Sequence, residues 1–272
     1  MQKFTYHCHT NFGNIFDGRN SAAEMIAQAE KLGFDKIGIS NHFIYHHHGP
    51  TTLPMMFNDS HKALEAFKTN VENIRNAAAH ARIPVYVGFE VDYFPSSRWR
   101  DEYEKMRSEL DVDYWIGAVH NLCSPDGENV INLYDIYWHN IRTYEHLVPK
   151  YYAAVYDILI EAINSGYFDI IAHLDIFKVF NLGTGPEWNQ AKRQVLDVLA
   201  AKGQIFELNT SGWNKCGEQH PEEWVLAEAN QRNIPLLISD DAHAVEQLGQ
   251  HYERAEEILS RLNYQNRVDL KS

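Results

Sequence analysis

Short apolar runs alternate with amphipathic stretches along the whole chain. The runs are rich in isoleucine, valine, phenylalanine and tyrosine, and most are bounded by glycine, proline, asparagine or aspartate, as expected for buried parallel strands. They cover residues 4–9, 36–42, 85–92, 114–121, 168–175, 204–211 and 235–243. Seven runs that alternate with helical segments predict a parallel sheet with right-handed crossovers.

The segments between the runs carry helical patterns. The first helix is expected to begin after Ser21, because Ser21 and Glu24 have the spacing of a capping box, and to end before Gly33. The predicted helices cover residues 22–32, 60–81, 97–109, 150–165, 188–201, 222–232 and 252–262. We interpret the stretch 121–150 as a loop-and-helix insertion, and residues 1–272 as one domain.

Potential metal ligands or hydrogen-bonding groups stand at the end of every apolar run. The set consists of His7, His9, His42, Glu90, His120, His173, Asp175, Glu207, Asn209, Asp241 and His243. A closed β/α barrel gathers all C-terminal strand ends on one face, where active sites lie, whereas a flat sheet would spread them out. The glycine-rich phosphate loops of nucleotide-binding sheets, GxGxxG and GxxxxGK[ST], are missing from the sequence. We therefore predict a TIM-like α/β barrel of parallel strands, with its active site at the C-terminal strand ends.

Composition narrows the classes of partner. The chain has 24 lysine and arginine residues against 37 aspartate and glutamate residues, a net charge of −13, so it lacks the basic stripe that nucleic-acid binding needs. Polar residues interrupt every apolar run well before the roughly 18 residues of a membrane span. The 3 cysteines form no CxxC pair and the N-terminus has no apolar signal segment. We expect reduced thiols in a cytoplasmic protein; the oligomeric state is left open.

The histidines indicate metal binding. The chain has 15 of them, as many as glycines. His7 and His9 are two residues apart on a predicted strand, so both rings should point to one side and Cys8 to the other. Imidazoles and carboxylates without a thiolate suit zinc, manganese or iron. Because the candidate ligands outnumber those that one ion takes, we expect two or three divalent ions with Glu90 as a bridging carboxylate, an arrangement that serves hydrolysis.

The motifs at the strand ends resemble those of the polymerase and histidinol phosphatase (PHP) family, and within it the histidinol-phosphate phosphatases. The matching segments are YHCHT at 6–10, SNH at 40–42, GFE at 88–90, GAVH at 117–120, AHLD at 172–175, ELNTSG at 207–212 and SDDAH at 239–243. The resemblance implies a distorted (β/α)7 barrel that hydrolyses phosphate monoesters in histidine biosynthesis. It makes L-histidinol phosphate, a small phosphorylated metabolite, the leading substrate.

The resemblance also implies how the ligands are shared between ions. One ion would take His7, His9, Glu90 and Asp241, a second Glu90, His120 and His173, and a third Asp17, His42 and His243. On spacing alone, Asp17 belongs to a turn with a solvated side chain. His243 follows Asp241 by two residues, which should place both on one strand face. We interpret Asp175 and Asn209 as groups that orient ligands, with a plain hydrogen-bonding cap as the alternative for either residue.

The implied mechanism is attack on phosphorus by a hydroxide that bridges the metals. Asp241 could accept the proton of the attacking water, and Asp17 or His243 could relay a proton to the leaving group. Contacts to the phosphate are predicted from Arg19, Lys178 and Lys215, which follow strand ends and are otherwise ordinary surface charges. The segment His46–His48 is interpreted as a solvated loop that could instead touch substrate, and His139 as a surface or packing residue.

Three positions depart from the family pattern and leave the substrate open. Asn41 stands where relatives usually have aspartate, and Trp213 and Asn214 stand where they often have leucine and arginine. Another small phosphomonoester is therefore an alternative substrate. Two alternatives of other classes are a metal-dependent amidohydrolase or deaminase and a non-catalytic or proofreading PHP module; the intact ligand set and acidic charge speak against the latter.

Overall fold

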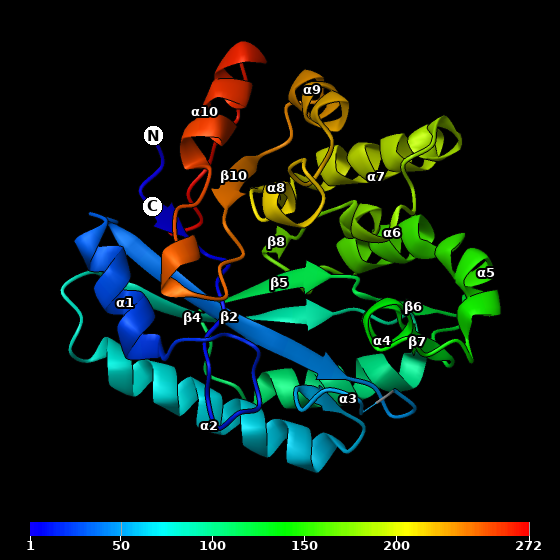
Figure 1. Ribbon diagram of the computed structural model, residues 1–272, viewed down its shortest axis with the longest axis horizontal. Helices are drawn as coiled ribbons and strands as arrows, with labels where there is room; N and C mark the ends of the chain where they lie inside the picture. Colours follow the sequence, from blue (N-terminus) through cyan, green and yellow to red (C-terminus); the bar gives the residue numbers. More distant parts are fainter. Residues whose placement is uncertain (50, 272) are drawn as a thin grey trace.

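Seven parallel strands form the central sheet of the protein. The computed structural model describes residues 1–49 and 51–271 (Figure 1). In spatial order the strands are β1 (Phe4–Thr5), β2 (Lys36–Tyr45), β4 (Val85–Asp92), β5 (Tyr114–Ala118), β8 (Ile170–Ile171), β9 (Ile205–Asn209) and β10 (Leu236–Ser239). The short β3 (Met56–Phe57) adds in parallel to the end of β2. The predicted parallel β/α barrel is confirmed, and the sheet is nearly closed.

The closure between β1 and β10 uses few backbone hydrogen bonds. Cys8 and Ala242 form an isolated parallel bridge, and the backbone N–H of His9 donates to the Ala242 carbonyl at 2.7 Å. Nearer the strand starts, the side-chain amide of Gln2 donates to the Ile238 carbonyl at 2.6 Å and accepts from the Ile238 N–H at 3.1 Å. A side-chain amide thus takes the place of a backbone pair at the seam.

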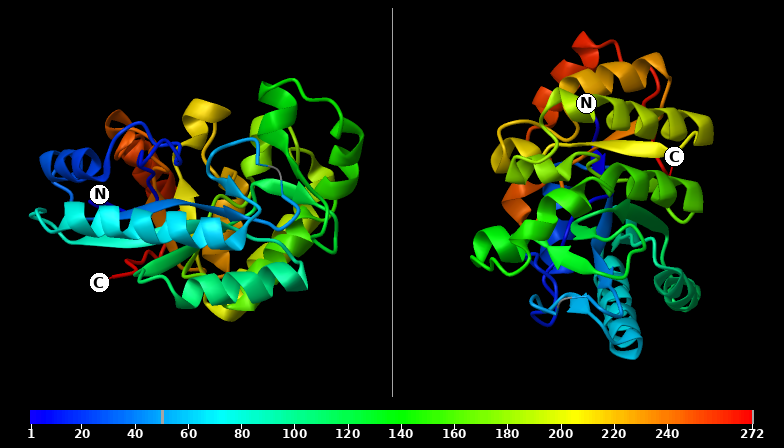
Figure 2. Two further views of the ribbon diagram at one scale, coloured as in Figure 1. Left: turned by 90° about the horizontal axis from the view of Figure 1, so that it is seen from below. Right: turned by 90° about the vertical axis from the view of Figure 1, so that its right-hand side faces the viewer.

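Helices surround the sheet on its outside (Figure 2). The longer ones are α1 (Ala22–Lys31), α2 (Ser60–Ala78), α3 (Ser97–Ser108), α6 (Val155–Ser165), α7 (Asn189–Lys202), α9 (Glu223–Gln231) and α10 (Tyr252–Arg261). Each predicted helix is present, although the segment 150–165 is divided into α5 (Val148–Tyr152) and α6. The predicted capping box is confirmed: the Glu24 N–H donates to Ser21 Oγ at 3.3 Å, and the Ser21 N–H to Glu24 Oε2 at 2.8 Å.

Five strands, β1, β5, β8, β9 and β10, are shorter than the apolar runs that predict them. The run 168–175 contains only the two-residue ladder of β8, and β10 ends at Ser239 although the run continues to 243. Residues 172–175 are nevertheless buried. An apolar run indicates which residues are buried, and not which residues pair with a neighbouring strand. Here the chain stays buried after its last strand hydrogen bond, because it leaves the sheet while it is still inside the mouth of the barrel.

The insertion between β5 and α6 contains a hairpin that the sequence pattern does not predict. β6 (Asn121–Cys123) and β7 (Val130–Asn132) pair in antiparallel fashion and lead into α4 (Leu133–Trp138). The run 114–121 merges the end of β5 with the start of β6, so the pattern hides the break between them. Shorter elements follow: α8 (Gly212–Lys215) and 3₁₀ turns at Glu145–Leu147, Ile176–Phe180, Pro186–Trp188 and Val245–Gln247.

Two apolar clusters fill the fold. The smaller one occupies the barrel interior and consists of Tyr6, Tyr114, Ile116, Ala118, Ile170, Ala172 and Leu237. Within it, the Tyr114 hydroxyl donates to the Tyr6 carbonyl at 2.6 Å. The larger cluster lies between sheet and helices. The packed interior forms a floor beneath the polar strand ends. Among the described residues, no helix combines the length and the apolar character needed to cross a membrane.

Candidate metal centre

The side chains predicted as metal ligands converge at the C-terminal ends of the strands. All nine belong to overlapping groups whose potential ligand atoms lie within 4.8 Å of one another: His7, His9, Asp17, His42, Glu90, His120, His173, Asp241 and His243. Local geometry explains part of this convergence. His42 and Glu90 are register partners on β2 and β4, so their side chains share one face, with His42 Nδ1 3.0 Å from Glu90 Oε2.

Glu90 lies at the centre of the cluster and is 1% exposed. Its Oε1 is 2.9 Å from His173 Nε2, 3.1 Å from His120 Nε2 and 3.2 Å from His7 Nε2. Burial opposes ionisation of this carboxyl, but the charges of His7 and His120 hold its pKa well below the usual range. A carboxylate surrounded by imidazole nitrogens in this way can bridge two cations.

The two carboxylate oxygens of Asp241 have different neighbours: one faces the ligand histidines and the other is held by hydrogen bonds. Oδ1 is 3.2 Å from His9 Nε2 and 3.7 Å from His7 Nε2. Oδ2 accepts hydrogen bonds from Lys215 Nζ and Ser211 Oγ, each at 2.9 Å. Burial disfavours its charge, yet Lys215 and His7 hold the pKa of Asp241 well below its usual range. One oxygen is therefore fixed and the other is free to meet a cation.

The expected shared strand face of Asp241 and His243 is wrong, although both side chains reach the cluster. β10 ends at Ser239, and Asp241 has a left-handed φ of 47°, which is uncommon for a residue other than glycine. His243 Nδ1 lies 3.5 Å from Asp241 Oδ1 and 2.9 Å from the Asp241 carbonyl oxygen. A turn, and not strand alternation, places these two groups together.

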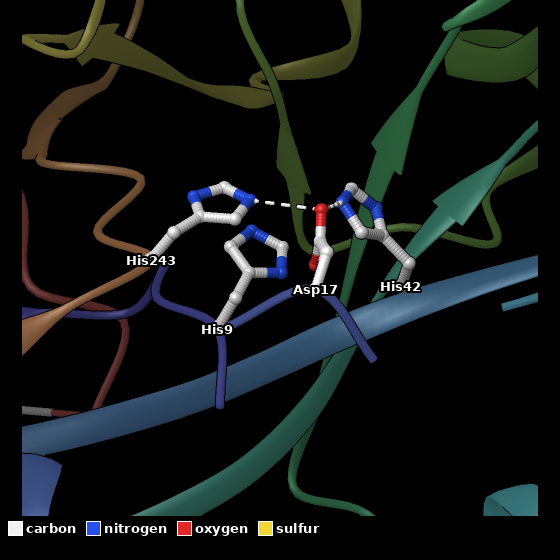
Figure 3. A group of neighbouring side chains, drawn as sticks. All are labelled: His9, Asp17, His42 and His243. Atoms are coloured by element: carbon white, nitrogen blue, oxygen red, sulfur yellow. Dashed lines mark ion pairs between the residues drawn. The ribbon is translucent and has the colours of Figure 1, made fainter. Parts of the chain in front are cut away.

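Asp17 completes the outer edge of the cluster (Figure 3). Its Oδ2 is 3.3 Å from His243 Nε2 and 3.4 Å from His42 Nε2, and its side chain is 36% exposed. His9 lies beside this group and stacks on both His42 and His243, with ring centroids 4.4 and 4.2 Å away. Burial, together with the charges of His243 and His42, lowers the pKa of His9 to about 3, so its imidazole is neutral.

Backbone contacts hold the Asp17 loop against the strand ends. The Arg19 N–H donates to the His243 carbonyl at 2.7 Å. Gly18 approaches Thr10 so closely that an added Cβ would lie 2.5 Å from the Thr10 Cα. Only glycine fits there, and the glycine that follows Asp17 is the one sequence feature that marks this position.

The buried polar atoms of the cluster fit divalent cations. His7 Nε2, His9 Nε2, His42 Nδ1 and Glu90 Oε2 are all buried without a hydrogen-bond partner. Orphaned groups of this kind are costly unless something satisfies them. Zinc–ligand bonds of about 2.0–2.1 Å in a tetrahedral site would separate ligand atoms by about 3.3 Å, close to the spacings found here. The cluster therefore suits bound divalent metal; how the ligands divide between ions stays a prediction, because the groups overlap.

Glu207 lies on β9 behind the cluster and orients two of its ligands, His7 and His173. Its Oε2 is 2.9 Å from His7 Nδ1 and accepts from Ser239 Oγ at 2.7 Å. Its Oε1 accepts from the His173 N–H at 3.0 Å and from Asn209 Nδ2 at 2.8 Å. A carboxylate on one nitrogen of a ligand histidine fixes the other toward the metal. Asn209 acts one step further out, because it holds Glu207.

Asp92 plays a similar part for His120. Its Oδ1 accepts from the His120 N–H at 2.7 Å and lies 3.9 Å from His120 Nδ1, while its other oxygen accepts from Asn121. The burial of Asp92 raises its pKa. The signal was present in the sequence, since Asp92 follows Glu90 by two residues on β4 and so shares its face.

A pocket of about 610 Å³ opens above the cluster. Its floor carries Asp17, His42, Glu90, His120, His173, Asp241 and His243, and its walls include Ile44, Leu53, Pro54, Met55, Met56, Tyr134, Trp138 and Ile176. The insertion after β5 supplies Tyr134, Trp138 and His139, of which His139 is 53% exposed, so it is a surface residue as expected and also lines the pocket. The insertion therefore lies over the strand ends that carry the candidate ligands.

The three predicted phosphate contacts lie in different surroundings. Lys215 lines the pocket, with Nζ held by Asp241. Lys178 turns inward: its Nζ is 3.2 Å from Asp175 Oδ2 and also donates to the Gln219 carbonyl. Arg19 is exposed, and neither it nor Lys178 is among the described residues that line the pocket. Of these three cations, Lys215 is the one placed to meet a pocket ligand.

Asp175 belongs to a buried network beside the site. It accepts from His220 Nδ1 at 2.7 Å and from the Glu222 N–H at 2.9 Å, in addition to Lys178. Burial disfavours its charge, but the His220 hydrogen bond and the Lys178 charge hold its pKa well below the usual range. Within the described part of the chain, Asp175 contacts none of the nine predicted ligands, so it supports the barrel mouth and not a ligand directly.

The three residues that depart from the family pattern have different surroundings. Asn41 is buried, accepts from the Thr10 N–H at 2.7 Å and donates to Thr10 Oγ1 at 2.9 Å, which holds the segment after β1. Trp213 is buried and packs beneath the Arg254 guanidinium, 4.6 Å from its ring centre. Asn214 alone of the three lines the pocket. Among the described residues, Asn214 is therefore the one of these three that is placed to contact a pocket ligand.

Comparison with known proteins agrees with this geometry. The model of the PHP domain family matches residues 5–211. A Deinococcus radiodurans protein named "Probable histidinol-phosphatase" is 33% identical over 170 residues, which are 62% of this chain and 61% of that protein. The histidinol-phosphatase of Bacillus subtilis is 25% identical over 278 residues, 93% of this chain and 98% of its own.

A solved structure extends the likeness to three dimensions. The histidinol phosphate phosphatase of Lactococcus lactis, determined in complex with zinc, L-histidinol and phosphate, superposes with a TM-score of 0.69. The overlap covers 98% of this chain and 95% of that one, at 16% sequence identity. At this identity the likeness concerns the fold.

Proposed function

Because the chain belongs to the PHP domain family, we propose that it is a metal-dependent phosphomonoesterase whose substrate is L-histidinol phosphate. The observation that carries the proposal is the convergence of nine imidazole and carboxylate side chains, seven of which line the floor of one pocket. The histidinol-phosphatase names of the relatives, and the L-histidinol and phosphate held by the Lactococcus protein, support this choice of substrate.

The nine residues would hold two or three divalent ions, zinc, manganese or iron. When bound, such ions supply Lewis-acid polarisation of the phosphoryl oxygens and a nucleophile at neutral pH. The remaining catalytic work belongs to the protein, which must orient the ester, neutralise its charge and move protons.

Asp241 and Lys215 act together at the attacking side. The ionised Asp241 can accept a proton at Oδ1, since Oδ2 is held by Lys215 and Ser211 at 2.9 Å each. The same Lys215 ammonium faces the pocket and can donate to a phosphate oxygen. Loss of Lys215 would therefore weaken phosphate binding most, with a smaller effect on Asp241, which Ser211 still holds.

Asp17 and His243 act at the side of the leaving group. Their side chains meet at 3.3 Å on the pocket rim, where they are 36% and 24% exposed. Where two ions occupy the deeper ligands and leave this pair without metal, a proton between Asp17 Oδ2 and His243 Nε2 can pass to a departing alkoxide, which would leave as an alcohol. The apolar and aromatic walls above them suit a small organic leaving group better than a highly charged one.

A comparison of substrates tests the proposal. Purified, metal-analysed protein should release inorganic phosphate from L-histidinol phosphate with a kcat/KM above that for other small phosphomonoesters. A preference for a different phosphomonoester would retain the reaction class and overturn the substrate. Release of ammonia from amides without phosphate release would instead indicate an amidohydrolase. Localisation in the cytoplasm, proposed from the cysteines, can be checked by fractionation.

A further inference from the structure

A second group of histidine and glutamate side chains lies where the chain leaves β2. His47, His48 and Glu128 each offer one ligand atom, and these atoms lie within 4.8 Å of one another. His47 Nε2 is 2.9 Å from Glu128 Oε2. Glu128 belongs to the turn between β6 and β7, so the group joins two segments far apart in sequence. None of the three is among the described residues that line the catalytic pocket.

The surroundings of His47 restrict the position of its ring. Its side chain is 2% exposed, and its Nδ1 is buried without a hydrogen-bond partner. The carboxylate oxygen Glu102 Oε2 lies 3.9 Å from this Nδ1. Glu102 is itself held by the Tyr45 hydroxyl and, at 3.3 Å, by Arg98 Nε. At 3.9 Å this carboxylate lies near Nδ1 without a hydrogen bond to it, so burial and the Glu128 contact, and not an outer carboxylate, hold the His47 ring.

Glu128 is also held in one orientation. Its Oε1 accepts a hydrogen bond from Ser96 Oγ at 2.6 Å, which leaves Oε2 directed at His47. The neighbouring ring of His46 stacks on His47 with centroids 4.3 Å apart, and its Nε2 is 2.7 Å from the Gly127 carbonyl oxygen. His46 and His47 thus both contact the β6–β7 turn, so the loop after β2 already lies against that turn.

The types of ligand atom and their exposure to solvent indicate which ion can bind. Two imidazoles and one carboxylate are ligands for zinc-like cations and not for calcium or magnesium, which prefer oxygen ligands. Glu128 is 40% exposed and His48 is exposed, so an ion can enter from solvent and complete its coordination with water.

We propose that His47, His48 and Glu128 bind one divalent transition-metal ion of the zinc type, separate from the catalytic centre. The ion clamps the loop after β2 to the β6–β7 turn. Beyond this loop the chain continues into Leu53 and Met55 of the pocket wall, so the clamp braces the wall without taking part in the chemistry.

Zinc counting on the loaded enzyme tests the clamp. Tag-free protein is saturated with Zn²⁺, freed of excess ion by gel filtration and analysed for zinc per chain by mass spectrometry. His48→Ala and Glu128→Gln should each hold one zinc fewer than the wild type, and their phosphatase activity should stay within about twofold. His61→Ala, which removes an exposed histidine on α2, is the matched control and should keep the full count.

Thermal unfolding supplies the second readout. Added Zn²⁺ should raise the Tm of the loaded wild type and of His61→Ala, and should raise the Tm of His48→Ala less, because a ligand that binds the native state alone stabilises it. Equal zinc contents in the wild type, His48→Ala and Glu128→Gln would overturn the proposal and leave the His47–Glu128 contact as a plain ion pair. The count is independent of the substrate, so this failure would not affect the proposed catalytic function.

Discussion

The deep half of the ligand cluster, which includes Glu90 and His173, is built differently from the rim half, which includes Asp17 and His243. Glu90 and His173 are 1% and 2% exposed and lie on or just after strands. Their side chains are 2.9 Å apart, and the backbone of His173 is held by the buried Glu207. Asp17 and His243 are 36% and 24% exposed and lie on loops that backbone contacts hold in place. The barrel therefore fixes the deep ligands directly, whereas loop anchoring fixes the rim. We expect the deep half to be indispensable and the rim half to be adjustable.

Loss of a deep ligand should have the largest effect. Glu90→Ala or His173→Ala should lower kcat/KM by about a thousandfold or more while the chain stays folded, because the central carboxylate or its imidazole partner is gone. Steady-state phosphate release, with circular dichroism for the fold and metal analysis for the centre, measures this. A near-normal kcat for either variant in metal-replete buffer would contradict a multinuclear centre around Glu90.

Loss of a rim ligand should cost less and should respond to metal concentration. Asp17→Asn keeps the shape of the side chain and removes its charge, and we expect activity to fall about ten- to a hundredfold, as for weakened metal sites elsewhere. Raising Mn²⁺ or Zn²⁺ in the assay should restore part of this activity, and should not restore that of Glu90→Ala. If Asp17→Asn is as inactive as Glu90→Ala and as insensitive to metal, the division into halves is wrong.

The pocket lysine should affect binding more than turnover. Lys215→Ala removes a charged hydrogen bond to phosphate, and we expect KM to rise about tenfold, with Lys215→Arg close to the wild type. Michaelis–Menten kinetics on both variants separates the two parameters. A fall in kcat with an unchanged KM would show instead that Lys215 acts through Asp241 and not on the phosphate.

The network beside the site should affect stability and leave catalysis nearly unchanged. Asp175→Asn removes the buried partner of Lys178 and leaves only the half-exposed Glu218, 3.4 Å away, and we expect a loss of about 3 kcal/mol in unfolding free energy at pH 7 with kcat/KM little altered. The folded pKa of Asp175 lies below its unfolded value of about 3.9, so its stabilisation is present above that pH and is lost as pH falls through the folded pKa.

Urea unfolding at two pH values measures that dependence. The difference in unfolding free energy between the wild type and Asp175→Asn should be largest at neutral pH and should shrink at about pH 3, where the carboxyl becomes protonated in the unfolded chain. A difference that is equal at both pH values would mean that the charge of Asp175 is not what stabilises the network.

The sequence predicts the deep half of the centre better than the rim, for a physical reason. Strand periodicity fixes which way a side chain points, so His7, His9 and Glu90 follow from the pattern of the runs. The same rule applied to Glu207 would have identified a group that orients ligands. Loops have no such period: Asp17 depends on the close approach of its loop to Thr10, which the sequence marks only by a glycine.

The lysines and the turn after β10 show the same limit. Lys178 and Lys215 both follow strand ends, yet one turns into a buried network and the other into the pocket. The left-handed φ of Asp241 likewise cannot be read from an apolar run. Proximity to a strand end predicts the face of the barrel on which a residue lies, and tertiary contacts decide where its charge points.

Removal and return of the metal tests the central claim most directly. Chelator-treated protein should remain folded and release no phosphate from L-histidinol phosphate, and titration with Zn²⁺ or Mn²⁺ should restore activity that levels off at about two to three catalytic ions per chain. Glu90→Ala should gain no activity in the same titration. Full phosphatase activity in protein shown to contain no metal would contradict the account.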